Sequence, residues 1–212
     1  MKKAFYIIFL LGLSSTLALS SGNNTGNNNC LEKYHGNPEE LLSVDLVGKF
    51  VDYEGAIAEA EKVSEQIIKD PDFAQVNCKW RIDRQRYIVR LKQISKIELY
   101  ESATPVERFH AKYHTRTDEE MKALQELYDK EVTEKADVEG SEIVSAAIGL
   151  DYTYLKIDGV GDAAVWEHQV NDLKVLLDDY QFTLNVDLNK GNEYDLEIAI
   201  LIANAIIEKA CN

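Results

Sequence analysis

Alternating apolar and polar positions are clearest in the last third of the chain. The segments 152–158, 163–168, 172–177 and 181–188 show this alternation and are separated by short turns. A period of two is typical of strands with one buried and one solvated face. Because the turns are short, we expect these four strands to form an antiparallel meander.

A helix of high hydrophobicity is predicted after the meander, over residues 193–209. Apolar residues cover most of its surface, and Glu197, Asn204 and Glu208 leave only a narrow polar stripe. Asn192 is placed to cap the first turn. A helix with this pattern must be almost wholly covered, so we expect it to pack on the meander.

Helical spacing also appears in the first third of the chain. Asn37 is followed by Pro38 and Glu39, a cap, a first-turn proline and a favourably placed acid, which together predict a helix over 38–50. A second helix is predicted over 54–69, where apolar residues again recur at helical spacing before Asp70 and Pro71.

The middle of the chain predicts one more long helix. Thr117 with Glu120 three residues later is a capping box, and the apolar stripe that follows indicates a helix to about residue 135. Residues 104–116 are expected to be a loop, and a short helix is expected around 143–147. Together these elements predict an α+β fold, an antiparallel sheet with helices packed on it.

A basic region lies on two further strands, 78–82 and 87–100, which are joined by a polar turn. It carries seven cations and one acid, Asp83, in a chain whose net charge is −14. The cations are Lys79, Arg81, Arg84, Arg86, Arg90, Lys92 and Lys96. They form either a site for an anionic ligand, with Arg84, Arg86 and Arg90 as candidates, or a solvated face that balances neighbouring acids.

The first twenty residues predict export. A basic start at 1–3, an apolar run at 4–13 and small residues at 18 and 20 are typical of a cleaved signal peptide. As a helix that run would rise only about 15 Å, against roughly 30 Å of bilayer hydrocarbon, so we expect no stable membrane span after cleavage. The expected location is periplasmic or extracellular.

Composition indicates one globular domain behind a leader. Residues 21–36 begin with a polar tract and are expected to be flexible. Residues 37–212 are expected to form a single domain, since the chain is 45% hydrophobic and 9% aromatic. The acidic charge repels phosphate backbones and excludes nucleic acid as an expected partner.

Three cysteines in an oxidising compartment suggest one disulfide and one free thiol. Strand alternation places Cys78 on the same face as Trp80 and Ile82, which is the core side, whereas Cys30 and Cys211 lie near the ends. We expect the pairing Cys30 with Cys211. A pairing of Cys78 with one of them remains the alternative.

The segment 159–166 reads GVGDAAVW, and two strands and an apolar terminal helix follow it. It resembles the GxGDxAxW signature of small exported bacterial proteins of unknown function with a PsbP-like fold. The resemblance implies an α/β sandwich and carries over no catalytic residue. Gly159, Gly161, Asp162 and Trp166 are interpreted as architecture, since glycines permit unusual backbone angles and an aspartate can hold a turn.

Reactive clusters are not evident in the sequence. His110 and His114 would lie on one side of a helix as a metal pair does, but no third ligand is evident, and ordinary surface histidines are the alternative. Nucleophile motifs such as GxSxG are missing, and the acidic pairs are adjacent in sequence rather than facing.

These observations lead to one main functional expectation. We expect a secreted or periplasmic domain that is not an enzyme, needs no cofactor and binds a protein or small ligand. The alternative is an envelope protein that binds divalent metal or an anion through the histidines or the arginines.

Overall fold

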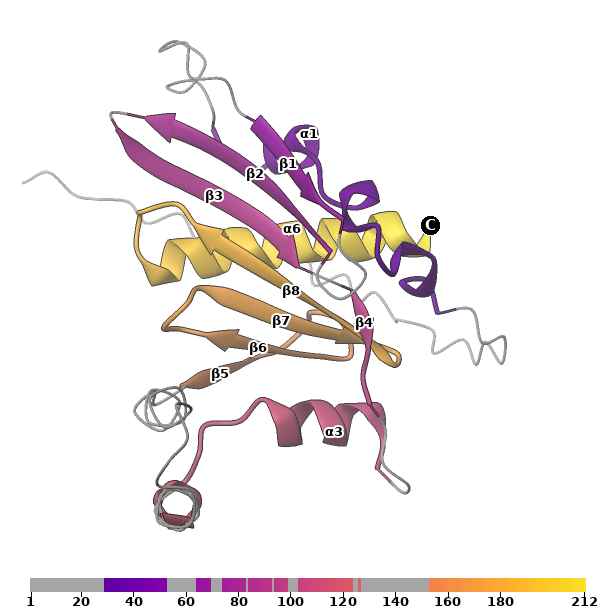
Figure 1. Ribbon diagram of the computed structural model, residues 1–212, viewed down its shortest axis with the longest axis vertical. Coiled ribbons are helices and arrows are strands. Elements are labelled where there is room, and N and C mark those ends of the chain that lie inside the picture. Colours follow the sequence, from indigo (N-terminus) through magenta and orange to yellow (C-terminus); the bar gives the residue numbers. More distant parts are fainter. Residues whose placement is uncertain are drawn as a thin grey trace, which may run out of the picture.

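An antiparallel β-sheet forms the centre of the protein (Figure 1). The computed structural model describes residues 29–52, 64–69, 74–82, 84–92, 94–98, 103–123, 126 and 153–212. Over these residues the chain folds as eight strands with helices packed on them, an α+β architecture. The predicted fold class is confirmed at this level.

All strand pairs are antiparallel, and the path through the sheet is β1-β2-β3-β8-β7-β6-β5, with β4 also pairing with β8. The strands are β1 (Ser64–Ile68), β2 (Gln75–Ile82), β3 (Gln85–Lys92), β4 (Ser95–Lys96), β5 (Tyr154–Ile157), β6 (Ala163–Glu167), β7 (Asp172–Leu177) and β8 (Tyr180–Asp187). The predicted C-terminal meander is therefore confirmed as β5 to β8.

The two halves of the chain meet where β3 pairs with β8, with Ile88 opposite Asp187 and Leu91 opposite Leu184. β4 pairs with the start of the same strand, Lys96 lying opposite Tyr180. In place of the one strand predicted over 87–100, the structure has two shorter strands, β3 and β4. Each pairs with a different part of the long β8.

The C-terminal helix α6 (Asn192–Cys211) lies across one face of the sheet, mainly over β8 and β7 (Figure 1). Ile198, Ile202 and Ile206 are buried in the core that α6 shares with the sheet. Removing each isoleucine from water contributes roughly 1.5–3 kcal/mol. Large sheet side chains in this core include Trp166, Trp80, Tyr180, Phe182, Leu91, Leu173 and Leu184.

Two details of α6 differ from the sequence expectation. Leu201 is 41% exposed, so the helix is buried on one side rather than almost wholly covered. Gly191, at φ +98°, occupies the cap position predicted for Asn192, and no side chain caps the helix. The positive φ explains why glycine stands there, since it adopts this angle without strain.

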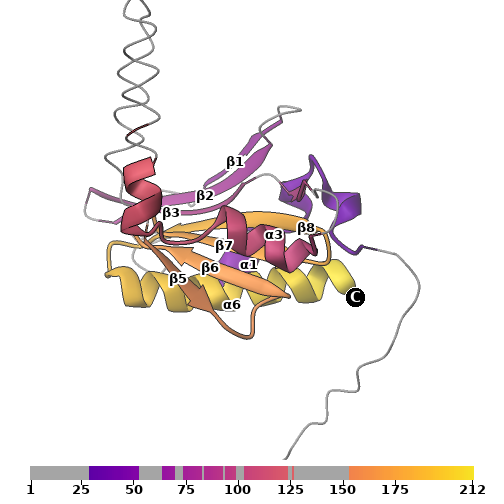
Figure 2. The ribbon, with the colours of Figure 1, turned by 90° about the horizontal axis from the view of Figure 1, so that it is seen from below.

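Helix α3 (Pro105–Lys112) packs on the opposite face of the sheet, as Figure 2 shows. Its Phe109 is fully buried in a second core with Val165 and Leu176. The prediction of a loop over 104–116 was wrong, because residues 105–112 are helical. Thr104 and Glu107 form a capping box, and Pro105 stands at the first helical position, where its fixed φ favours a helix.

The N-terminal described segment contains three short helices, η1 (Glu32–Tyr34), η2 (Pro38–Glu40) and α1 (Val44–Val47). The single helix predicted over 38–50 is broken, because Ser43 accepts a hydrogen bond from the Leu46 amide and starts a new helix there. Leu31 is fully buried and Tyr34 nearly so. Residues 29–36 of the predicted leader therefore belong to the folded domain.

The prediction of a helix over 54–69 was wrong at its end, because residues 64–68 form the edge strand β1. This strand pairs with β2, with Ser64 opposite Lys79 and Ile68 opposite Gln75. Pairing with a neighbouring strand outweighs the local helical spacing there.

At 117–123, the Glu120 amide donates to the Thr117 hydroxyl and residues 118–123 are helical, as predicted. The signal peptide 1–20, residues 54–63, most of the predicted 117–135 helix and the 143–147 helix lie outside the described residues.

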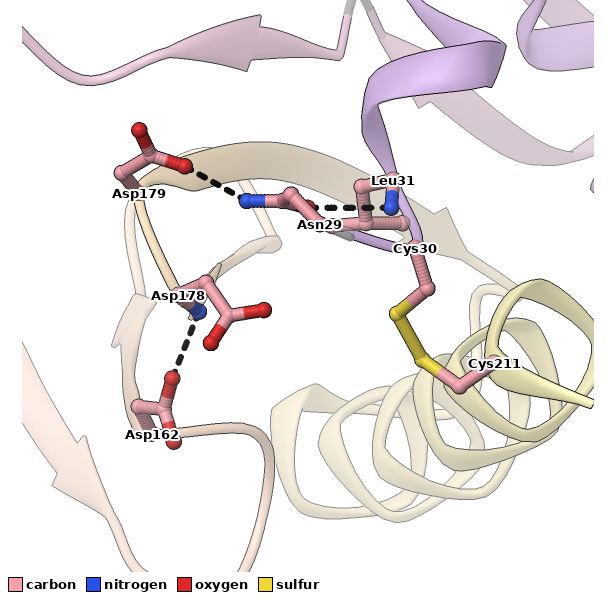
Figure 3. Close-up of a disulfide and its surroundings, with 7 residues drawn as sticks. All are labelled: Asn29, Cys30, Leu31, Asp162, Asp178, Asp179 and Cys211. Carbon is pink, nitrogen blue, oxygen red and sulfur yellow. Dashed lines mark hydrogen bonds between the residues drawn. A yellow bond between two sulfur atoms is a disulfide. The ribbon is translucent and has the colours of Figure 1, made fainter. Parts of the chain in front are cut away.

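A disulfide joins Cys30 to Cys211 across a sequence separation of 181 residues (Figure 3). It connects the start of the described chain to the end of α6, and the neighbouring Asn29 donates a hydrogen bond of 2.5 Å to Asp179. Cys78 is a free, buried thiol whose pKa burial raises to about 12. The predicted pairing is confirmed.

Replacing Cys211 with serine is expected to lower the free energy of unfolding by about 2–5 kcal/mol, because the unfolded chain gains entropy when a long loop is opened. Urea unfolding followed by circular dichroism measures the change. Cys30→Ser should cost the same, and the double variant should cost no more, since all three remove one cross-link. An unfolding midpoint equal to that of the oxidised wild type would contradict the expectation.

A buried carboxyl holds the junction between β8 and α6. Asp195, in the first turn of α6, is 2% exposed. One of its oxygens accepts from the Leu188 amide and the other from the Asn171 side chain, both at 3.3 Å. Burial raises the pKa of Asp195 from 3.8 to about 6, with the charge of Asp187 adding to the rise.

The folded protein therefore holds a proton on Asp195 more tightly than the unfolded chain does. The stability this contributes is fully present below pH 3.8 and is lost as the pH rises to about 6. Asp195→Asn stays neutral throughout, so wild type should lose stability relative to the variant across this window, in urea unfolding measured at several pH values. A difference that is constant from pH 4 to 7 would contradict the assignment.

Candidate functional site

The face of the sheet opposite α6 brings four cations together on the β2–β3 hairpin. Arg81 lies directly opposite Arg86, and Arg90 lies opposite Asn77. On β2, Lys79 lies between Asn77 and Arg81, two residues from each. Because opposed residues share a face and side chains alternate along a strand, Lys79, Arg81, Arg86 and Arg90 project from one surface, called the basic face below.

The basic face carries unfavourable electrostatics. Arg81 and Arg86 are both exposed, and like charges directly opposite each other destabilise a strand pair. Burial lowers the pKa of Lys79, and the charges of Arg86 and Arg90 lower it further. Asp187 is the acid on the adjacent strand, opposite Ile88, and no ion pair joins it to a cation in the described part of the chain.

The predicted site Arg84, Arg86 and Arg90 is therefore brought together only in part. Arg84 lies in the turn between the strands, exposed and at φ +71°. The Arg90 guanidinium donates from Nε to the Asn77 side-chain oxygen at 2.5 Å, which orients it on the face. On the basic face itself Arg81 and Arg86 are exposed, whereas Lys79 and Arg90 are half-buried.

Two other members of the basic region are neutralised by acids. The Lys92 ammonium lies 2.5 Å from the Asp172 carboxylate, and that of Lys96 lies 2.7 Å from Asp179. For these two residues the alternative expectation, a strand face that balances neighbouring acids, describes the structure. The basic region is divided between paired cations and the basic face.

A buried charged cluster adjoins the basic face on β6 and β7. Lys174 lies 2.8 Å from Glu167 and 3.7 Å from Asp172, and both acids are at most 5% exposed. Its ammonium also lies 5.2 Å from the centre of the Tyr113 ring. Asp172 is buried and Lys174 is half-buried, because the neighbouring strands and the end of α3 pack around them.

A cleft between β4 and α3 was not foreseen from the sequence, because residues 104–116 were expected to be a loop. It encloses about 510 Å³. Its lining residues are Ser95, Lys96, Ile97, Glu98, Arg108, Ala111, Lys112 and Gln181. Recognition of the Thr104–Glu107 capping box would have predicted the helix that forms one of its walls.

His110 and His114, the predicted metal pair, each have other contacts in the structure. His110 lies in α3 with its ring edge-on to Phe109, whereas His114 follows the helix. Both ring nitrogens of His114 have partners, the Ala111 carbonyl at 2.9 Å and the Glu120 carboxylate at 3.0 Å. The described residues contain no group of three or more histidine, cysteine or acidic side chains placed to hold a metal ion.

The glycines of the GxGDxAxW segment serve a tight turn before β6. Gly159 and Gly161 have φ of +79° and +57°. A Cβ on Gly161 would lie 2.3 Å from the Leu176 carbonyl oxygen, so only glycine fits this approach of the turn to β7. Asp162 accepts a hydrogen bond of 2.6 Å from the Asp178 amide, which joins the two turns (Figure 3).

Gly161→Ala is expected to destabilise the protein by roughly 1–3 kcal/mol more than Gly159→Ala. Both variants place alanine at a positive φ, but only the first also forces a Cβ onto backbone, since nothing lies within 4 Å of the other. Urea unfolding of the two proteins compares them directly. Equal losses would show that the close approach to Leu176 carries no energetic weight.

The chain was compared with protein-family models, curated proteins and solved structures, and none of the three comparisons found a match. No helix within the described ranges combines the length and apolarity needed to cross a bilayer.

Proposed function

We propose that this protein is an exported, non-catalytic binding domain and that its basic face docks an acidic segment of a protein partner. The observation that carries the proposal is the concentration of cations on the β2–β3 hairpin of a chain with net charge −14. Electrostatic complementarity of this kind guides encounter and orients the partner.

The arrangement of Arg81 and Arg86 supports a binding role over a structural one. A like-charged pair on a strand hairpin lowers stability, and in the described structure no carboxylate pairs with either guanidinium to compensate. A bound carboxylate would relieve this repulsion. Arginine also suits the task, because its planar fork binds carboxylates through two parallel hydrogen bonds.

The shape of the basic face favours an extended partner. From Arg86 to Arg90 the strand rises about 14 Å, and the cations lie on two neighbouring strands about 5 Å apart. A single small ion would contact only one end of this surface. An acidic peptide segment or protein edge can contact several of its cations at once.

Export and the PsbP-like relationship belong to the same proposal. The basic and apolar start of the sequence and the Cys30–Cys211 disulfide support an oxidising compartment outside the cytoplasm. The turn at 159–166, the strands that follow it and the packing of α6 on an antiparallel sheet support a PsbP-like architecture.

The test compares two double variants that change the net charge equally. Arg81→Glu/Arg86→Glu alters the basic face, whereas Lys49→Glu/Lys209→Glu alters exposed lysines elsewhere. With a fluorescent polyglutamate peptide in low salt, fluorescence anisotropy should show affinity reduced at least about tenfold for the first variant and little change for the second.

Three results would overturn the proposal. The first is equal loss of affinity in the two double variants, which would indicate an effect of net charge alone. The second is absence of wild-type binding in low salt. The third is catalytic turnover of an ester, glycoside or phosphate substrate that a single side-chain substitution abolishes, because the proposed protein is not an enzyme.

A further inference from the structure

The cleft between β4 and α3 is held open by contacts on both of its walls. Arg108 of α3 donates from Nε to the Glu98 carbonyl at 2.9 Å, which fixes the helix to the chain after β4. Phe109 anchors the same helix in the second core. At the end of α3, the Tyr113 hydroxyl donates to Gln181 at 3.1 Å. The cavity is therefore formed before any ligand arrives, which reduces the entropic cost of binding.

Cations dominate the lining of the cleft. Among the lining residues that the structure describes, Lys96, Arg108 and Lys112 face one acid, Glu98, although acids outnumber cations 37 to 23 in the whole chain. The Lys112 ammonium lies 5.1 Å from the centre of the Tyr113 ring, and no carboxylate of the described residues forms an ion pair with it. Its ammonium can therefore meet an incoming anion without breaking an ion pair.

Neutral hydrogen-bonding groups complete the lining. The Gln181 side chain donates to the Ser95 hydroxyl oxygen at 3.4 Å while its own oxygen accepts from Tyr113. The Ser95 proton is then available for an acceptor in the cleft. Lys96 keeps its partner Asp179 and contributes positive potential rather than a vacant donor.

We propose that this cleft binds a small organic anion carrying several carboxylate or phosphate oxygens. The volume of about 510 Å³ falls within the range of small-molecule sites and exceeds what a single inorganic ion fills. Lys112 and Arg108 supply the charge, and Ser95 supplies a directional donor. This site is separate from the basic face and takes a different class of ligand.

Isothermal titration calorimetry of the full chain with citrate, and separately with inorganic phosphate, tests the proposal. Sodium chloride at matched ionic strength corrects for screening. Saturable citrate binding with Kd below about 5 mM is expected, and Lys112→Glu should weaken it at least about fivefold. Lys209→Glu makes the same charge change on the exposed side of α6, away from the cleft, and should leave the affinity unaltered. Binding of inorganic phosphate tighter than citrate would contradict an organic anion as the occupant, because one such ion does not fill the cleft.

The inference would be overturned by equal loss in Lys112→Glu and Lys209→Glu, or by no saturation with either anion up to about 20 mM. The Arg81→Glu/Arg86→Glu protein separates it from the proposed function. Retained citrate affinity in that protein supports the cleft. Loss of citrate affinity there, with retention in Lys112→Glu, would place the anion on the basic face. That result would overturn the inference about the cleft and leave the proposed function standing. Because Lys112 is exposed and outside both cores, its variant is expected to fold.

Discussion

The packing of α6 on one face of the sheet is the interaction on which the rest of the structure depends. Ile198, Ile202 and Ile206 meet the apolar side chains of strands from both halves of the chain. The disulfide then fixes the end of the same helix to the start of the described chain. Burial and cross-link together hold β3 beside β8, although these strands are far apart in the sequence.

A consequence is that the opposite face is free to carry charge. Side chains alternate along each strand, so the apolar residues that α6 covers leave their neighbours pointing away from it. On β2 and β3 these neighbours are the cations of the basic face, and on β6 and β7 they are the buried cluster of Lys174, Glu167 and Asp172. Substitution of the exposed arginines therefore need not disturb the core.

Helix α3 turns part of that polar face into one wall of an open cleft. Phe109 packs the helix against Val165 and Leu176 in the second core. Its other side, with Arg108 and Lys112, then forms a wall of the cleft against β4. Stability and ligand contact are thus divided between two sides of one short helix.

Local pattern in the sequence was sufficient for the meander and for α6, because strand alternation and helical hydrophobicity do not depend on distant neighbours. For the cysteines it favoured the pairing of Cys30 with Cys211 but left a pairing of Cys78 open, and the structure decided between them. Sequence reasoning also found the cations, but not that Lys92 and Lys96 are neutralised by Asp172 and Asp179. Only the tertiary structure decided that β8 pairs with β3, that residues 64–68 form an edge strand, that Glu167 and Asp172 are buried around Lys174 and that a cleft lies beside α3. Each of these depends on which segments meet in space, and local periodicity contains no information about that choice.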